Sequence, residues 1–255
     1  MCFPHDALPP IKPIAGAAID TEDLVLTSKD GTKFAAFVAR AENPSGAGIV
    51  ILPDVRGLFR FYEELAMRFA EEGINAVAFD FFGRTAGVAK RDADFDFMPE
   101  VRQTKADKIT EDVGACVDYL RSSPGGSCTS VFTVGFCFGG SNSWLQAGGG
   151  HALAGAIGFY GRPGPSFVDQ SPGPQDRVKE LKAPILGLMG GADQGIPQDQ
   201  VDAFEKALKA AGVHHEIVVY PGAPHSFFDR LYEEHAAASA DAWKRCLDFV
   251  RSNAK

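Results

Sequence analysis

Residues 131–140 read VFTVGFCFGG, and this stretch decides the fold that the sequence predicts. The apolar run 131–134 predicts a strand buried on both faces, and the glycine-containing turn after it leads into a predicted helix. A strand, a sharp turn and a helix carrying the pattern G-x-C-x-G form a nucleophile elbow in which Cys137 stands where serine is usual. The N-terminus of the helix favours a thiolate there. The residues alone also allow a buried structural cysteine in a glycine-rich turn.

Strands alternate with helices on both sides of this turn. Apolar runs predict strands at 48–52, 75–79, 154–160, 184–189 and 216–220, and helical spacing predicts helices over 62–69, 109–120, 201–208 and 236–250 and through 144–145. The alternation predicts an α/β fold, with a mainly parallel sheet covered by helices on both faces. Residues 24–27 and 33–39 flank an Asp30-Gly31 turn, which predicts an antiparallel hairpin at one edge of the sheet.

The remaining segments indicate one domain with an arm and two long loops. Residues 1–20 contain four prolines and no periodic pattern, so we expect an extended arm. No linker divides the chain, which predicts a single domain over residues 1–255. The irregular stretches 81–108 and 161–175 are candidates for functional loops, because ligands of parallel sheets bind where loops leave the carboxyl ends of the strands.

The composition excludes several classes of protein. The chain has 255 residues, of which 45% are hydrophobic and 23% charged, as is typical of a soluble globular domain. Its net charge of −8 argues against a nucleic-acid or anionic-membrane surface. The five cysteines are odd in number and form no C-x-x-C pair, which argues against a disulfide framework or a zinc site. No signal peptide or membrane span is visible, so we expect a cytoplasmic protein.

Two further residues complete a predicted catalytic group around Cys137. Asp193 follows the strand 184–189, and His225 follows the strand 216–220. Since the carboxyl ends of parallel strands meet at one edge of a sheet, we expect all three side chains at that edge. Their order along the chain, nucleophile then acid then histidine, is the order that accompanies a nucleophile elbow of this kind. The histidine would serve as base and the aspartate would orient it, with no metal or cofactor.

These motifs together resemble the dienelactone hydrolase family of α/β-hydrolases. The resemblance runs from about residue 24 to residue 250. It is carried by LPDVRG at 52–57, DFFGR at 80–84, GFCFGG at 135–140, GFYG at 158–161, GGADQGIP at 190–197 and GAPHSF at 222–227. The α/β-hydrolase fold that the resemblance implies agrees with the alternation of strands and helices.

The resemblance also implies a role for each matching residue. Cys137, Asp193 and His225 would form the catalytic triad, and the oxyanion hole would use the backbone N–H groups of Val55 and Phe138. The site residues implied around the triad are Asp54 as partner of the resting thiol, with Arg84, Tyr160, Phe227 and Arg230 binding the substrate.

Three positions depart from the family pattern. Asp54 stands where relatives carry glutamate, and Arg56 stands where they carry an aromatic residue. Asp229 occupies the position of a second substrate-binding arginine, with Arg230 one residue later. The substrate can therefore differ from dienelactone.

The phenylalanine content has two interpretations. Twenty of the residues are phenylalanine, against five tyrosines and two tryptophans. The plainer interpretation is core filling, and the other is an aromatic wall around a pocket. The second interpretation rests on residues that we expect to border the site, namely Phe136, Phe138, Phe159, Phe227 and Phe228.

The predicted function is hydrolysis of a small ester or lactone through a thioester acyl-enzyme. We expect a small-molecule substrate, with or without a carboxylate, no nucleic-acid or membrane partner, and a monomer or small homo-oligomer. A general carboxylesterase or thioesterase and an acyltransferase share the same triad and remain alternatives. Two alternatives come from other classes, a non-catalytic binding protein and a thiol redox sensor that uses Cys137.

Overall fold

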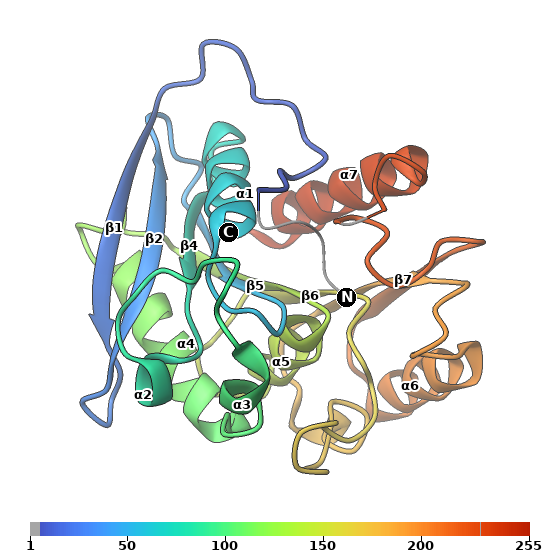
Figure 1. Cartoon of the computed structure of the whole chain (residues 1–255). Coiled ribbons are helices and arrows are strands. Elements are labelled where there is room, and N and C mark those ends of the chain that lie inside the picture. The colour runs from blue at the N-terminus through green and yellow to red at the C-terminus, as the bar shows by residue number, and fades with distance from the viewer. Residues whose placement is uncertain (1–5, 230) are drawn as a thin grey trace.

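The structure is a computed structural model that describes residues 6–229 and 231–255. An eight-stranded sheet lies between two layers of helices, in the strand order β1-β2-β4-β3-β5-β6-β7-β8 (Figure 1). The strands are β1 (Ile19–Thr27), β2 (Lys33–Ala41), β3 (Ala47–Leu52), β4 (Asn75–Phe79), β5 (Ser130–Phe136), β6 (Gly155–Phe159), β7 (Ile185–Gly190) and β8 (His215–Tyr220).

The sheet combines an antiparallel edge with a parallel body. β1 and β2 form the expected hairpin at one edge, β2 pairs antiparallel with β4, and the pairs from β4 through β3 to β8 are parallel. The hairpin turn is closed by the N–H of Ser28, which donates to the carbonyl of Thr32 at 2.8 Å. Every residue of β3, β4, β5, β6 and β7 is buried, because helices cover both faces. The predicted fold class is confirmed.

Helices divide between the two faces as their apolar positions require. α1 (Arg60–Glu71) and α7 (Ala236–Asn253) cover one face, while α4 (Ala106–Arg121), α5 (Phe138–Gln146) and α6 (Gln198–Ala211) cover the other (Figure 1). α6 ends at Gly212, whose φ of 70° is left-handed and costs little only for glycine. The N–H of Gly212 donates to the carbonyl of Lys209 at 3.1 Å, so this terminus is capped by the backbone.

Local differences from the predictions occur mainly in the long loops. The stretch 81–108, predicted to be irregular, contains the short helices α2 (Gly83–Ala86) and α3 (Phe97–Val101). A 3-10 turn, Val178–Glu180, follows the loop 161–175. The predicted arm, residues 1–20, is shorter in the structure, because β1 begins at Ile19, and its first five residues lie outside the described part of the chain. No helix in the described ranges combines the length and apolar character of a membrane-spanning segment.

The strand order places two loops side by side at the carboxyl edge. The chain moves outward from β3 to β4 and then crosses back to β5 on the other side of β3. Such a reversal leaves a crevice beyond the ends of the two strands. Leu52 at the end of β3 is paired in register with Gly135 of β5, so the loop that begins at Pro53 lies beside the turn that carries Cys137.

Candidate active site

Cys137 occupies a strained turn between β5 and α5. Its backbone dihedrals are φ 54° and ψ −113°, outside the regions that residues with a side chain prefer. Hydrogen bonds on both sides hold the turn. The N–H of Cys137 donates to the carbonyl of Phe159 at 3.1 Å, and its own carbonyl accepts from the N–H of Gly140 at 3.0 Å. This strain at a candidate nucleophile is typical of functional sites that the surrounding fold holds in place.

The glycines of the motif allow α5 to approach the sheet. A Cβ atom on Gly139 would lie 2.1 Å from the carbonyl oxygen of Leu52 and 2.2 Å from that of Pro53. A Cβ atom on Gly135 would lie 1.9 Å from the carbonyl oxygen of Gly139. Both separations are far below van der Waals contact, so only glycine fits at these positions. The motif therefore fixes the distance between the start of α5 and the end of β3.

His225 and Asp193 meet at the same edge of the sheet. Nδ1 of His225 lies 2.6 Å from Oδ2 of Asp193. The other oxygen, Oδ1, accepts from the N–H groups of Gly195 at 2.8 Å and Ile196 at 3.2 Å. The Asp193 side chain is 1% exposed and that of His225 is 36% exposed. Backbone N–H groups thus hold the Asp193 carboxylate in place, while the imidazole of His225 faces the cavity that Cys137 also lines.

Tyr160 supports the imidazole from one side. It follows β6, has a φ of 37°, and its ring centroid lies 5.0 Å from that of His225. Its hydroxyl donates to Oδ2 of Asp229 at 2.8 Å. Burial raises the pKa of Tyr160 well above its ordinary value, and the nearby Asp229 carboxylate acts in the same direction. Tyr160 is therefore a neutral hydrogen-bond donor beside the candidate base.

Asp54 is engaged by its neighbour Arg56. Nη2 of Arg56 lies 3.0 Å from Oδ2 of Asp54, and the Arg56 N–H donates to Oδ1 at 2.9 Å. The Asp54 N–H in turn donates to the hydroxyl oxygen of Tyr62 at 2.9 Å. The two residues that differ from the family pattern, Arg56 and Asp54, therefore form an ion pair with each other. The implied pairing of Asp54 with the resting thiol stays a prediction.

Arg84 lies in a neighbouring cavity rather than among the residues that line the cavity of Cys137. Its Nη1 is 2.6 Å from Oδ2 of Asp112, a side chain that is 1% exposed, and its Nε is 3.2 Å from Oδ2 of Asp30. The two cavities share Thr104 and Ile109 in their walls, so they adjoin. The implied contact of Arg84 with substrate stays a prediction.

The other expected residues differ in their placement. Val55 follows β3 and Phe138 begins α5, so both backbones lie at the crevice between the ends of β3 and β5. Their role as oxyanion donors stays a prediction. Phe227 is fully buried and packs edge-on against Tyr160, with ring centroids 5.6 Å apart. Arg230 lies outside the described residues.

Most of the expected aromatic wall serves as core. Phe136 stacks on Phe159 and Phe228 with centroid distances of 4.7 and 5.8 Å, and all three rings are buried in the core on the face that α1 and α7 cover. Of the five phenylalanines expected to border the site, Phe138 lines the cavity in the described part of the chain.

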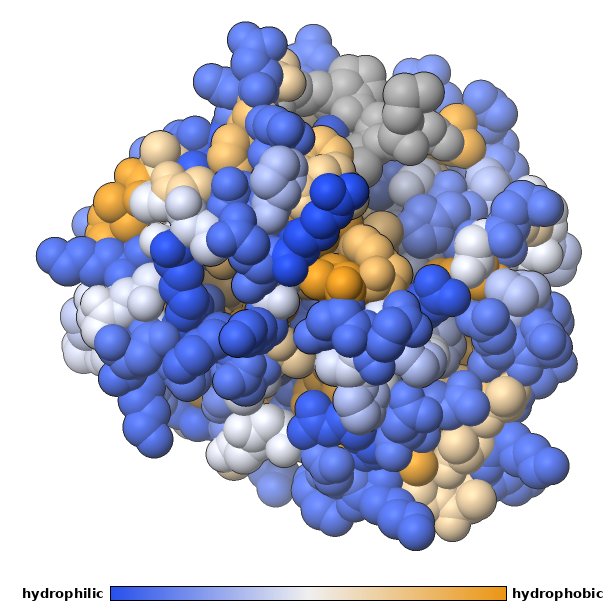
Figure 2. All heavy atoms as spheres, turned by 60° about the horizontal axis from the view of Figure 1, so that its bottom comes forward, coloured by the Kyte–Doolittle hydropathy of each residue, from blue (hydrophilic) through white to orange (hydrophobic). Residues whose placement is uncertain are grey.

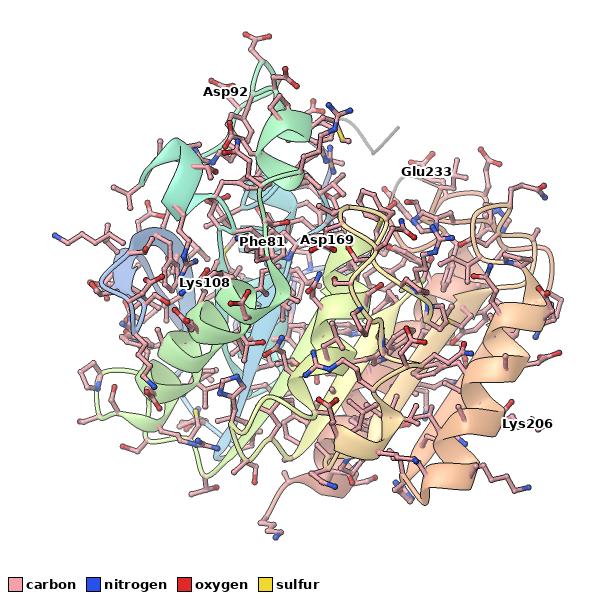
Figure 3. The ribbon with its side chains drawn as sticks, turned by 90° about the horizontal axis from the view of Figure 1, so that it is seen from below. Phe81, Asp92, Lys108, Asp169, Lys206 and Glu233 are labelled. Carbon is pink, nitrogen blue, oxygen red and sulfur yellow. The ribbon has the colours of Figure 1, made fainter. Side chains whose placement is uncertain are left out.

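The cavity extends from Cys137 beneath the loop 161–175 and has a volume of about 170 Å³. Figure 2 turns the lower side of Figure 1 forward and shows apolar surface at its centre, bordered by hydrophilic side chains. In Figure 3, Asp169 on this loop and Phe81 after β4 are seen between two helices, α4, which Lys108 marks, and α6, which Lys206 marks. The residues that sequence reasoning missed are Phe167 and Ile109. The signal that could have found Phe167 was the length of the loop.

The described residues contain no group of three histidine, cysteine or acidic side chains placed to hold a metal ion. Cys116, Cys128 and Cys246 are buried, and burial raises the pKa of each thiol. Of the four cysteines that the structure describes, Cys137 is the most accessible to solvent.

Comparison with known families decides the relationship of the chain. Residues 34–253 match the family model described as the dienelactone hydrolase family. The chain belongs to the dienelactone hydrolase family. A protein of Escherichia coli strain K12 named "Putative carboxymethylenebutenolidase" is 30% identical over 257 residues, which cover 95% of this chain and 93% of the relative. A protein of the same name from Methylorubrum extorquens is 30% identical over 96% of this chain and 87% of the relative.

Solved structures agree with this assignment. A crystal structure named "Putative Dienelactone Hydrolase" from Klebsiella pneumoniae has a TM-score of 0.81 and 28% identity, and the match covers 92% of this chain and 99% of that one. A dienelactone hydrolase-like promiscuous phosphotriesterase from metagenomic libraries has a TM-score of 0.75 at 22% identity, which shows a shared fold. This member of the dienelactone hydrolase family is a carboxylic ester hydrolase with a small-molecule substrate.

Proposed function

We propose that this dienelactone hydrolase family member cleaves small esters or lactones through a Cys137-His225-Asp193 triad. The observation that carries the proposal is the 2.6 Å contact of Asp193 with His225, an imidazole that lines the same cavity as the strained Cys137. A nucleophile, a base and a residue that orients the base are the three parts that covalent catalysis requires.

The first half-reaction forms a thioester. The Cys137 thiolate, formed by proton transfer to Nε2 of His225, attacks the carbonyl carbon of the ester. The carbonyl electron pair moves to oxygen, and the N–H groups of Val55 and Phe138 stabilise the resulting oxyanion. The tetrahedral intermediate then collapses, the bond to the alcohol oxygen breaks, and His225 returns its proton to the departing alcohol.

The second half-reaction regenerates the thiol. His225 accepts a proton from water as the oxygen of that water attacks the thioester carbonyl. The second tetrahedral intermediate collapses, the bond to the Cys137 sulfur breaks, His225 returns its proton to that sulfur, and the acid is released. Asp193 holds Nδ1 of His225 as the donor throughout, so that Nε2 faces the reacting atoms.

The electrostatics at the start of α5 support a reactive thiol. Cys137 precedes the first turn of α5, whose free N–H groups carry partial positive charge. The ion pair between Arg56 and Asp54 offsets the carboxylate charge beside the site. We propose that Asp54 is the partner of the resting thiol and that substrate binding releases the thiolate. Arg56 is a second partner for the Asp54 carboxylate.

A test compares Cys137→Ala, His225→Ala and Asp193→Asn with the natural protein on p-nitrophenyl acetate. We expect each substitution to lower kcat by at least about a hundredfold. His215→Gln is the matched histidine control, since His215 begins the strand that leads to His225 and contacts the carbonyl of Val213 at the opposite edge. Full activity in Cys137→Ala would rule out the proposed nucleophile.

Mass spectrometry identifies the intermediate directly. When turnover of an activated ester by the natural protein is quenched with acid, we expect the acyl group on the peptide that contains Cys137, because the thioester links the two half-reactions. Addition of a small alcohol separates hydrolysis from transfer. Release of free acid in the presence of the alcohol supports hydrolysis, whereas quantitative formation of the new ester supports the acyltransferase alternative.

A further inference from the structure

The cavity next to Cys137 has an apolar wall built from several elements. α4, α5 and the loops after β6 and β7 each contribute aliphatic or aromatic side chains, namely Ile109, Phe138, Leu145, Phe167, Val168 and Ile196. A small site with such walls gains affinity mainly by removing apolar ligand surface from water.

Phe167 is the exposed end of a row of aromatic rings. Its side chain is 43% exposed, although large apolar side chains are usually buried. Its ring meets that of Phe138 edge-on, with centroids 5.9 Å apart, and Phe138 meets Phe81 at 5.4 Å on its other side. Phe138, in the middle of the row, directly follows Cys137 and lines the same cavity. A ligand ring in the cavity would extend this edge-on packing.

Backbone hydrogen bonds hold the loop that presents Phe167. The N–H of Ser166 donates to the carbonyl of Ser171 at 2.9 Å, and the N–H of Gln175 donates to the carbonyl of Pro163 at 2.9 Å. The Ser141 hydroxyl of α5 donates to the carbonyl of Arg162 at 2.9 Å. The loop is therefore closed on itself and attached to the helix that carries the nucleophile, so little ordering is needed when a ligand binds.

The charged groups around the cavity give no concentrated positive field among the described residues. Arg162 and Asp169 line it, carry opposite charges and are both exposed to solvent. In the adjoining cavity, Arg84 pairs with Asp112 and Lys108 with Asp30, at 2.6 and 3.1 Å. A carboxylate on the substrate would lose hydration against an apolar wall without a dedicated cation from these residues.

The volume limits the size of the group that fits. The cavity measures about 170 Å³. A dry apolar cavity of about 150 Å³ holds one benzene molecule. We propose that the site selects uncharged esters with one apolar group about the size of a phenyl ring, which packs against Phe138 and Phe167 in the cavity wall. This substrate class rests on the proposed ester hydrolysis and narrows it.

Four ethyl and acetyl esters test the selection. Ethyl phenylacetate carries the ring in its acyl part, benzyl acetate carries it in the alcohol part, ethyl acetate has no ring, and monoethyl adipate carries a carboxylate. We expect kcat/KM for at least one of the ring esters to exceed that for ethyl acetate by about tenfold, with monoethyl adipate no better than ethyl acetate. Preference for monoethyl adipate over both ring esters would overturn the inference.

Variants identify the responsible side chains. Phe167→Ala should lower the ratio of ring-ester to ethyl acetate kcat/KM by about fivefold, and Phe167→Tyr should preserve most of it. Val25→Ala is the control, because Val25 is an exposed apolar residue on the edge strand β1. An unchanged ratio in Phe167→Ala would contradict the role of this ring. A preference for monoethyl adipate that Arg162→Ala abolishes would assign the site to acidic esters.

A binding measurement separates this inference from the proposed reaction. Titration calorimetry of Cys137→Ala with ethyl phenylacetate and monoethyl adipate reports selection without turnover. Binding of the ring ester that is weakened by adding Phe167→Ala supports the inference, whether or not the natural protein hydrolyses the esters. If the natural protein hydrolyses none of the four esters, the proposed function is refuted. Hydrolysis of ethyl acetate without discrimination in favour of a ring supports the proposed function and overturns the inference. Failure to bind the ring ester overturns it as well.

Discussion

Nδ1 of His225 lies 2.6 Å from Oδ2 of Asp193, and the second oxygen of Asp193 accepts two backbone N–H groups from its own loop. The carboxylate therefore has a fixed orientation before any substrate binds. The other oxygen faces the imidazole, and because a carboxylate can only accept a hydrogen bond, the proton between them lies on Nδ1 of His225.

Asp193→Asn should separate geometry from tautomer. The amide oxygen can still accept from Gly195 and Ile196, but its amide nitrogen then faces Nδ1 of His225 and favours the wrong tautomer. We expect kcat to fall by roughly 10³- to 10⁴-fold with little change in thermal stability. Steady-state kinetics with a parallel melting curve measure both quantities. Retention of activity would show that Asp193 does not orient the base.

Gly139→Ala should damage the elbow itself. The new methyl group would overlap the carbonyl oxygens of Leu52 and Pro53, so either α5 or β3 must move. We expect a loss of at least about 1–3 kcal/mol in the free energy of unfolding, together with loss of activity. Gly164→Ala is the matched control, since a methyl group added there would have no atom within 4 Å. Equal stability of the two variants in urea would disprove the close-approach argument.

Tyr160→Phe removes the hydroxyl that donates to Asp229 while it keeps the ring beside His225. Asp229 is buried and would lose one hydrogen bond, so we expect the free energy of unfolding to fall by about 1–3 kcal/mol. A double-mutant cycle with Asp229→Asn measures the coupling between the two side chains. Additive effects in that cycle would mean that the observed hydrogen bond contributes nothing to stability.

Arg84→Met tests whether this arginine serves the fold or the substrate. Its guanidinium pairs with Asp112, which is 1% exposed, and loss of that partner leaves a buried carboxylate. We expect destabilisation of about 3–5 kcal/mol, measured by urea denaturation. The ratio of kcat/KM for neutral and carboxylate-bearing esters should stay constant. A selective rise of KM for the carboxylate-bearing ester would instead support the substrate contact that the sequence implied.

Thiol labelling should follow burial. Burial raises the pKa of Cys116, Cys128 and Cys246, so these thiols stay protonated when the pH rises from neutral to mildly alkaline. We expect iodoacetamide to alkylate Cys137 in the native protein while the other three react only after unfolding. Peptide mapping by mass spectrometry measures the rates. Alkylation of Cys246 as rapid as that of Cys137 would contradict the buried placement.

Periodicity and strand ends sufficed for most of the framework. The apolar runs that predicted strands correspond to β3 to β7, because a strand covered on both faces is apolar throughout, and to β8, an edge strand that is partly buried. The meeting of Asp193 and His225 followed from the same pattern, since each begins a loop at the carboxyl end of a strand. The elbow at Cys137 is likewise local, since its glycines and dihedrals belong to one short segment.

The tertiary structure alone decided which partner each polar or aromatic side chain found. Arg84 matched a family position in the sequence, yet its nearest acid is Asp112, 28 residues away on α4. Phe227 was expected to border the site but is buried and packs edge-on against Tyr160, whereas Phe167, which the sequence did not single out, lines the cavity. The spacing of apolar residues along the chain indicates the type of element and the face on which each side chain lies. The partners of that side chain depend on how elements distant in the sequence pack together. The sequence by itself therefore determined the fold and the strand ends at which Cys137, Asp193 and His225 lie, and packing determined the pocket.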